Sequence, residues 1–275
     1  MCRVLGVSRS GYYTWLNRPA SQHAQGNSTL SEQIRVIYQE SGARYGSPRI
    51  HRELQVRGLR CGKKRVARLM RQQQLHACNP RRFVATTDSS HASPIAANVL
   101  DRQYQVEAVE ALNRVWAGDI TYIPTAGGWL YLAVILDLKS RRVIGWGMSP
   151  TLEQTVVHQA LEMALGQRAP QQSGSGLLFH SDRGSQYAAG AYQKRLRDQG
   201  IGCSMSRRGN CWDNAPLESF FATLKKELVH RERYQTREQA KASVFSYIEV
   251  FYNRKRRHSA LGYLSPHDYE QTMLN

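Results

Sequence analysis

The chain has 275 residues, of which 41% are hydrophobic, and this is enough for one large or two modest hydrophobic cores. No apolar run approaches the roughly 20 residues that span a bilayer, and the five cysteines form no CxxC pair, so neither a membrane span, a disulfide framework nor a zinc knuckle is expected. The formal net charge of +17 suits a polyanion, with nucleic acid the first candidate, while a basic but inert surface is the alternative.

The N-terminal part of the chain is predicted to be helical. A short helix is expected over residues 8–17, followed by a linker, and together these make up a first segment of residues 1–28. A longer helix is expected over residues 30–41, behind a cap formed by Ser28 or Thr29. Its apolar residues recur at helical spacing, at Leu30, Ile34, Ile37 and Tyr38.

Residues 29–76 have the pattern of a helix-turn-helix domain. One helix is expected to be capped by Ser47 and to end near Arg57, before Gly58, and a second to run from about Lys63 to Gln73. In the second helix apolar residues face inward and basic residues repeat outward, which favours DNA binding over an ordinary solvated helix. The candidate DNA contacts on it are Lys63, Lys64, Arg65, Arg68 and Arg71.

The middle of the chain changes from helical to β-rich patterns. Residues 77–111 are expected to be a basic linker, and VWAGDITYIP, WLYLAVILDL and RRVIGWGM then predict three antiparallel strands. The next expected elements are a helix (about 152–166), the strand LLFHSD, a helix (near 186–198), the strand IGCSMS and the helix of NAPLESFFATLKKEL. This order predicts a mixed α/β core over residues 112–230. Residues 231–275 are expected to form a C-terminal helical extension, with a helix over about 236–253.

Three acidic residues occupy positions where a charge is unusual. Asp119 lies within the strand VWAGDITYI, on one face with Ala117 and Thr121, where a charge is costly unless a partner stabilises it. Asp182 ends the apolar run LLFHSD before a glycine turn, and α/β sheets place their ligands at such strand ends. Glu218 lies at the edge of the apolar stripe of the helix that begins near Pro216.

The spacing of these acids allows them to meet at one edge of the sheet. Between Asp119 and Asp182 lie 62 residues, and between Asp182 and Glu218 lie 35. Clustered carboxylates repel one another unless cations neutralise them, and hard oxygen ligands suit Mg²⁺ or Mn²⁺. Two such ions roughly 3.5–4 Å apart can activate an attacking oxygen and stabilise a leaving one at a phosphodiester. Each acid taken singly could instead be an edge-strand polar residue, a turn residue or a first-turn acid.

Two other polar residues in this region are assigned structural roles. Asp137 closes a strand just before the connection KSRR and is expected to cap that turn. His180 is expected to be a packing residue at a strand end. No second His or Cys lies at metal-ligand spacing, so zinc is not expected.

The segments WAGDITYI, HSDRGSQY and NAPLESFFATLKKEL resemble the DDE catalytic domain of bacterial insertion-sequence transposases. The family is insertion sequence family three, specifically its second-frame product, and YGSPRIHREL and FYNRKRRHSALGYLSP extend the resemblance over nearly the whole chain. The resemblance implies a ribonuclease H-like catalytic core of the retroviral-integrase superfamily, preceded here by the small all-α helix-turn-helix domain.

The resemblance also implies the chemistry of the site. Asp119, Asp182 and Glu218 would be catalytic and would bind two Mg²⁺ ions, with Asp119 bridging them, and Mn²⁺ is expected to substitute. Lys225, seven residues after Glu218, would contact the DNA of the element end. The basic residues of the loop before the helix, Arg207 and Arg208, are further candidate DNA contacts.

The resemblance implies a copy-out-paste-in route, in which one strand is cut at an element end and its 3′-OH attacks beside the other end. The expected partners are double-stranded DNA with terminal inverted repeats, target DNA, further copies of the chain on DNA, and the upstream-frame product or a frameshift fusion with it. The expected location is the bacterial cytoplasm, on the nucleoid. Two other functions remain open, namely a DNA-binding regulator derived from a transposase and a ribonuclease H-like structure-specific nuclease.

Overall fold

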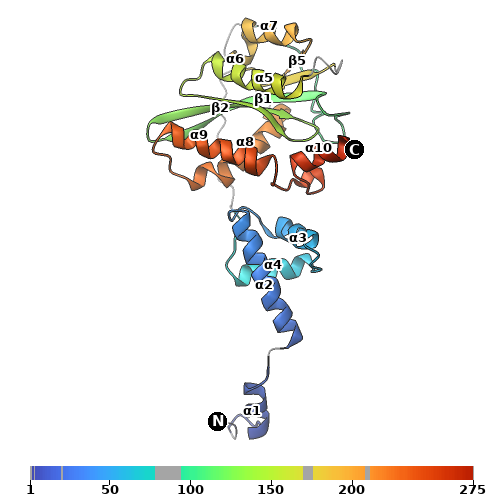
Figure 1. Cartoon of the computed structure of the whole chain (residues 1–275), viewed down its shortest axis with the longest axis vertical. Coiled ribbons are helices and arrows are strands. Elements are labelled where there is room, and N and C mark those ends of the chain that lie inside the picture. The colour runs from blue at the N-terminus through green and yellow to red at the C-terminus, as the bar shows by residue number, and fades with distance from the viewer. Residues whose placement is uncertain are drawn as a thin grey trace. The chain divides into compact units, whose positions relative to one another are not determined.

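The computed structural model describes residues 2, 4–19, 21–77, 94–169, 176–207 and 211–274. The chain divides into two compact units, Met1–Cys78 and Asn79–Asn275, which are described separately (Figure 1). No helix in these described ranges is both long and apolar enough to cross a membrane.

The first unit is all-helical. Its helices are α1 (Arg9–Leu16), α2 (Gln22–Glu40), α3 (Ser47–Val56) and α4 (Lys63–Gln72). Helices α2, α3 and α4 pack on one another around fully buried side chains, among them Ile34, Ile50, Leu54 and Val66. The two helices of the predicted helix-turn-helix are therefore present, and Gly58 (φ 77°) follows α3 as expected.

The predicted start of the helix expected over residues 30–41 was wrong. The linker was expected to reach residue 28, but α2 begins at Gln22, because the Ser21 side chain accepts a hydrogen bond from the Ala24 N–H (3.2 Å). Thr29 lies inside the helix, where its Oγ1 donates to the Gln25 carbonyl (3.3 Å). The first buried residue of α2 is Leu30, so its exposed early turns carry no apolar periodicity that a sequence pattern could detect. Similarly, Gly46 rather than Ser47 occupies the N-cap position of α3.

The second unit is built on a five-stranded mixed sheet with the order β3-β2-β1-β4-β5. Its strands are β1 (Val115–Thr125), β2 (Gly128–Asp137), β3 (Val143–Ser149), β4 (Leu178–Ser181) and β5 (Gly202–Met205). Strands β1, β2 and β3 pair antiparallel, whereas β4 pairs parallel to both β1 and β5. The predicted mixed α/β core with three antiparallel strands is therefore confirmed.

Helices cover both faces of this sheet (Figure 1). On one face lie α5 (Gln154–Arg168), α6 (Ser185–Ala188) and α7 (Gly190–Asp198), and on the other lie α8 (Ala215–Glu227), α9 (Arg237–Phe245) and α10 (Pro266–Leu274). The single helix predicted near residues 186–198 is thus two helices, because Ala189 takes an extended backbone between them (φ −60°, ψ 136°).

A hydrophobic core lies between the sheet and the helices α5, α6 and α7. Its bulky side chains include Trp116, Phe179, Tyr187, Tyr192 and Leu161. Helix α5 approaches the backbone of β3 closely, because Gly145 and Gly147 carry no side chain there. A Cβ atom at these two glycines would clash with the carbonyl oxygens of Ala160 and Val156 in α5.

The last predicted helix begins as expected and then changes its geometry. Thr236 and Gln239 form a capping box at the start of α9, and the helix continues as a π-helix over Ser246–Tyr252. The residue after it, Asn253, accepts a hydrogen bond from the Val143 N–H (3.0 Å) and donates one to the Val143 carbonyl (2.9 Å). The Asn253 amide therefore pairs with the outer edge of β3 as a neighbouring strand would.

Two buried acids hold the connection between β2 and β3. Asp137 accepts hydrogen bonds from the N–H groups of Asn113, Lys139 and Ser140 (2.7, 2.9 and 3.0 Å), which confirms its predicted role as a turn cap. Glu270 of α10 accepts hydrogen bonds from the Ser140 hydroxyl (2.8 Å) and from the guanidinium groups of Arg142 (2.6 Å) and Arg168 (2.5 Å). Glu270 thereby connects α10 to the turn and to the end of α5.

The Glu270 cluster predicts a stability that falls at acid pH. Burial by itself raises the pKa of Glu270, but Arg168 and the hydrogen bonds from Arg168, Ser140 and Arg142 lower it below its ordinary value. A carboxylate with a lowered pKa stabilises the fold above the unfolded pKa of about 4.3, and this contribution is lost as the pH falls through the folded pKa. Glu270→Gln should therefore cost roughly 1–3 kcal/mol near neutral pH and much less under acid conditions.

Urea unfolding followed by tryptophan fluorescence measures this effect, because four of the five tryptophans belong to the second unit. The exposed Glu238 of α9 provides the control variant Glu238→Gln. A constant difference between Glu270→Gln and the wild type at neutral and acid pH would contradict the role given to Glu270.

Candidate active site

The pairing of β1 with β4 places Asp119 next to Asp182. The parallel register pairs Gly118 with Ser181, and the next residues are the two acids, Asp119 within β1 and Asp182 directly after β4. Neighbouring strands lie about 4.8 Å apart. Two carboxylates predicted from separate segments therefore leave adjacent backbone positions where β4 ends.

Local hydrogen bonds orient both carboxylates. Asp119 Oδ1 accepts a hydrogen bond from the Ile120 N–H (2.7 Å), and Asp182 Oδ1 accepts one from the Gly184 N–H (2.9 Å). Glycine is needed beside Asp119, because a Cβ atom at Gly118 would lie 2.5 Å from the Phe179 ring. The close packing of Phe179 against this backbone thus fixes the strand that carries Asp119.

Helix α8 positions Glu218, the third acid, beside β1. The predicted apolar stripe is buried, at Leu217, Phe220, Phe221 and Leu224, and α8 packs against β1. Glu218 lies in the first turn and is half-buried. Asn214 occupies the N-cap position of α8 without a side-chain hydrogen bond, and the Asp213 carboxylate bonds to Arg207 instead.

The three acids share one electrostatic environment. Burial raises the pKa of Asp119 well above its ordinary value, and the neighbouring Asp182 carboxylate raises it further, followed by Glu218. The Asp119 side chain keeps some exposed surface. Its pKa is therefore raised by the protein atoms packed around it, without complete enclosure of the side chain. Burial also raises the pKa of Glu218. Ionised together, these carboxylates are mutually destabilising, and positive charge is needed to hold them there.

Lys225 supplies one positive charge near Asp119. Its Nζ lies 4.8 Å from the centre of the Tyr122 ring, three residues along β1 from Asp119. Burial lowers the pKa of Lys225, and the field of Asp119 acts in the opposite direction. In the described ranges, no group of three His, Cys, Asp or Glu side chains is arranged to hold a metal ion.

A buried ion-pair cluster precedes α8, and the sequence did not reveal it. Asp213 has no exposed side-chain surface, and its carboxylate accepts hydrogen bonds from Arg207 (Nε and Nη2, both 2.9 Å) and Arg102 (Nε, 3.0 Å). Asn98 Nδ2 and the Arg207 N–H also donate to it (3.0 and 2.9 Å). The cluster therefore joins the segment before β1, the end of β5 and the 3₁₀ turn that leads into Glu218.

The other end of α8 is anchored by a second buried ion pair. Glu227 accepts hydrogen bonds from Arg256 (Nε, 2.9 Å, and Nη2, 2.8 Å) and from the Tyr247 hydroxyl (2.8 Å). Both charged side chains are 5% exposed. Helix α8 is thus held at its start through Asp213 and at its end through Glu227, and Glu218 and Lys225 lie between these anchors.

The predicted DNA contacts differ in their surroundings. On α4, Lys63, Lys64, Arg68 and Arg71 are exposed, but Arg65 is half-buried and donates to the Asn27 side chain (2.8 Å). In the second unit Arg207 forms an ion pair with Asp213, and Arg208 lies outside the described residues.

His180 lies near the acids but fills a packing position, as predicted. It is buried, and its ring nitrogens pair with the hydroxyls of Ser204 (2.9 Å) and Ser206 (3.2 Å). Burial lowers the pKa of His180 to about 4, so the ring is neutral at physiological pH.

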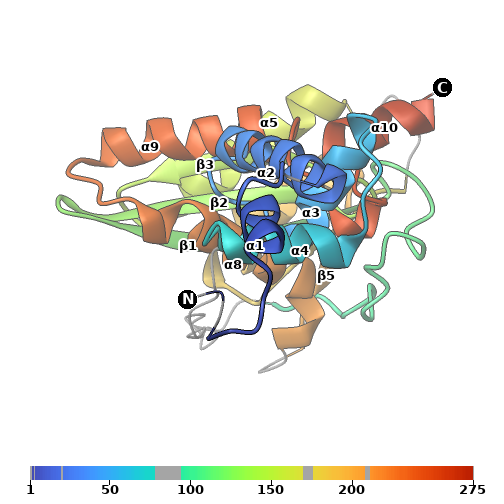
Figure 2. The ribbon, with the colours of Figure 1, turned by 90° about the horizontal axis from the view of Figure 1, so that it is seen from below.

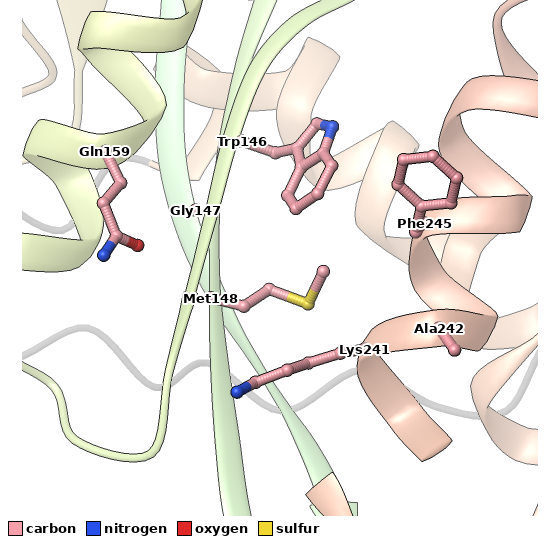
Figure 3. A pocket seen from close by; sticks show the side chains of 7 residues that line it. All are labelled: Trp146, Gly147, Met148, Gln159, Lys241, Ala242 and Phe245. Atoms are coloured by element: carbon pink, nitrogen blue, oxygen red, sulfur yellow. The ribbon is translucent and has the colours of Figure 1, made fainter. Parts of the chain in front are cut away.

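A pocket between β3 and α9 lies apart from the three acids. Figure 3 shows Trp146 and Met148 of β3 facing Phe245, Ala242 and Lys241, with Gln159 on the other side of the strand. None of the three acids lines this pocket. The pocket is therefore separate from the position where Asp119 and Asp182 lie side by side at the end of β4.

Three segments of the chain match known family models. Residues 26–83 match an HTH-like domain, and residues 110–211 and 218–274 match two integrase core domain models. The chain is 42% identical to the insertion element IS600 uncharacterized 31 kDa protein of Shigella sonnei, over 97% of this chain and 96% of that protein. It is also 42% identical to the transposase InsF for insertion sequence IS3A of Escherichia coli K12, over 100% of this chain and 94% of InsF. Among solved structures, the catalytic core domain of BIV integrase is 19% identical, with a TM-score of 0.43, over 59% of this chain and 97% of that domain.

The Asp213 cluster predicts a local loss of order when its charge is removed. Hydrogen bonds to a charged group contribute roughly 1.5–3 kcal/mol each, so Asp213→Asn should free the start of α8 and speed amide exchange there about ten-fold or more. Hydrogen exchange measured by mass spectrometry should show the change in peptides covering 207–221 and none in α5.

Asp101→Asn is the matched control, because Asp101 is 67% exposed and contacts Arg207 only at the rim of the cluster (3.3 Å). Equal exchange in Asp213→Asn, Asp101→Asn and the wild type would show that the cluster does not fix α8.

Proposed function

The chain belongs to the IS3 family of insertion-sequence transposases, which are polynucleotidyl transferases with an integrase core, and we propose that Asp119, Asp182 and Glu218 are its catalytic residues. Its HTH-like domain and its family make it a DNA-binding enzyme. The observation that carries the assignment is the β1–β4 register, which places Asp119 beside Asp182. The effect of Glu218 on the pKa of Asp119 supports its membership in the same site.

An integrase core depends on divalent metal ions, and we assign Mg²⁺ to this site, with Mn²⁺ as a substitute. The donors present fit this choice, because all three are carboxylates, and Mg²⁺ binds through one or two carboxylates together with water and substrate phosphates. Asp119 would bind both ions, and Asp182 and Glu218 would each bind one. When bound, the ions would stabilise the negative charge on the attacking and leaving oxygens of the phosphodiester.

The residues of the chain itself orient the DNA. Lys225 lies about 10 Å along α8 from Glu218, at 1.5 Å per residue, so it is placed to hold a phosphate next to the one that reacts. The anchors at Asp213 and Glu227 fix both ends of α8, which keeps Glu218 and Lys225 at a constant spacing. Arg207 supports this geometry through Asp213 and is a weaker candidate for direct DNA contact.

We assign the DNA-binding domain to residues 29–76, and residues 1–28 to an N-terminal helical segment that includes the first turns of α2. The catalytic core is assigned to residues 112–230, with residues 77–111 as linker and residues 231–275 as C-terminal extension. The substrates are double-stranded DNA at the inverted repeats and at the target, in a copy-out-paste-in reaction on the bacterial nucleoid. We further propose that several copies act together on DNA, with the upstream-frame product or as a fusion with it.

The catalytic assignment predicts that strand cleavage requires a divalent ion and each of the three acids. Asp119→Asn, Asp182→Asn and Glu218→Gln should each reduce cleavage of an element-end duplex at least about 10³-fold, because each removes a negatively charged metal ligand. DNA affinity should remain near that of the wild type. Chelation with EDTA should abolish cleavage, and added Mg²⁺ or Mn²⁺ should restore it.

Gel analysis of labelled strands separates the possible outcomes. The exposed carboxylate Glu162 of α5 provides the control Glu162→Gln, which should cleave normally. Full cleavage by any one of the three variants would remove that acid from the site. Cleavage without joining of the 3′-OH would indicate a nuclease, and binding without cleavage a regulator.

The exposed basic face of α4 should bind DNA phosphates. The double variant Lys64→Ala/Arg68→Ala should weaken binding to all DNA sequences and reduce the slope of log affinity against log salt by roughly 0.9 for each phosphate that is no longer neutralised. Arg35→Ala/Arg52→Ala removes the same charge from the exposed surfaces of α2 and α3 and is the control. Fluorescence anisotropy across a salt series gives both slopes, and equal slopes for the two double variants would assign α4 no special role in DNA binding.

A further inference from the structure

An exposed aromatic pair lies on the β1–β2 hairpin. The register pairs Tyr122 with Tyr131 and Pro124 with Trp129, so Tyr122 and Trp129 are diagonal neighbours on one face of the hairpin. Their rings meet edge to face, with centres 4.8 Å apart and planes at 82°. Trp129 is nevertheless 48% exposed, whereas Trp116 of the same sheet is completely buried. The edge-to-face contact with Tyr122 supports the Trp129 ring, and much of the indole surface faces solvent.

This aromatic pair is continuous with the proposed active site. The Lys225 ammonium lies over the Tyr122 ring, and it also lies close enough to Asp119 for the two charges to influence each other. Lys225 therefore links the acids to the aromatic pair. A DNA strand whose phosphate is held at Asp119 and whose next phosphate meets Lys225 would bring its neighbouring bases toward Tyr122 and Trp129.

Basic residues also border the hairpin on its far side. The segment before α9 closes over the hairpin tip, where the Ala126 N–H donates to the Tyr234 carbonyl (2.9 Å), and Figure 2 shows both segments reaching the same end of the sheet. Arg237 Nε donates to the Trp129 carbonyl (3.0 Å), and Arg233 is exposed beside Tyr234. Positive charge therefore lies at both members of the aromatic pair, Lys225 at Tyr122 and Arg237 at Trp129, and basic residues with exposed aromatic rings are the combination that single-stranded nucleic-acid sites use.

Stabilisation of the hairpin alone explains less of this arrangement than a role in nucleic-acid binding does. Cross-strand aromatic pairs do stabilise hairpins, but they do so by covering each other and the sheet. About half of the Trp129 surface stays exposed, and basic residues contact the aromatic pair at Tyr122 and at Trp129. An aromatic face beside phosphate-binding cations is suited to stack on a base, and a base offers its face only when it is unpaired or at a strand end.

We propose that Trp129, supported by Tyr122, is a stacking platform for an unpaired nucleobase a few nucleotides from the phosphodiester that reacts at Asp119, Asp182 and Glu218, because Trp129 lies opposite Pro124, further along β1 than Asp119. The proposal rests on the proposed function of these acids and adds a base-binding residue to it. Trp129 would hold the opened end of the strand in place, and because every base has an aromatic face, it would sense the absence of pairing more than the identity of the base.

The test measures cleavage of an element-end duplex in which each base near the cut is replaced, one at a time, by an abasic site. With the wild type, one abasic position should slow cleavage about ten-fold, because stacking on an aromatic side chain has roughly that effect on binding. Trp129→Ala should slow cleavage of the intact duplex by a similar factor and show no further loss at that abasic position. Trp129→Phe should retain most of the activity.

Phe245→Ala is the matched control, because Phe245 is 49% exposed on α9 and lies by the pocket of Figure 3. A second measurement, independent of cleavage, uses 2-aminopurine at the sensitive position in Ca²⁺, where wild type and Trp129→Phe should quench its fluorescence and Trp129→Ala should not. The platform would be overturned if Trp129→Ala slowed cleavage by the same factor, relative to the wild type, on intact and on abasic DNA. Quenching of 2-aminopurine fluorescence by Trp129→Ala would also overturn it. Cleavage by Asp119→Asn would instead overturn the proposed function and leave the fluorescence result standing.

Discussion

Parallel pairing of β1 with β4 forces two like charges, Asp119 and Asp182, to leave the sheet side by side. Burial and mutual repulsion raise the pKa of Asp119, so this arrangement is unfavourable for the protein alone. The fold must therefore hold it by packing elsewhere, and the large core around Trp116 and Phe179 does this directly beneath the two strands. The close approach of the Phe179 ring to Gly118 leaves β1 little room to shift away from β4.

Two kinds of acid in the second unit differ in their partners. Asp213, Glu227 and Glu270 each accept hydrogen bonds from at least one arginine at 3.0 Å or less, and each joins elements distant in sequence. Asp119, in contrast, has a hydrogen bond from the next backbone N–H and feels the charge of Lys225. The first group satisfies its charges within the protein and stabilises it. The electrostatic environment of Asp119 is suited to cations and DNA supplied from outside.

Local sequence patterns predicted the structural features that depend on neighbouring residues. They did not reveal which residues far apart in the sequence form hydrogen bonds or ion pairs. Alternation located β1, and the apolar stripe gave α8 and the edge position of Glu218. The adjacency of Asp119 and Asp182 followed only from the expectation that strand ends meet at one sheet edge. Nothing local indicated that Asp213 would bind Arg102, which lies 111 residues away. The early turns of α2 were missed because they bury no apolar residue.

The unequal lengths of β1 and β4 explain why the acids, Lys225 and the aromatic pair lie together. Strand β4 has 4 residues and β1 has 11, so the pairing with β4 ends at Gly118 and the rest of β1 continues in the hairpin with β2. Lys225 reaches the Tyr122 ring along this edge. A longer β4 would cover the backbone beside Asp119 and separate α8 from the hairpin. The short strand thus leaves β1 unpaired with β4 beyond Gly118, where we propose that a DNA strand meets carboxylates, an ammonium group and an aromatic face in succession.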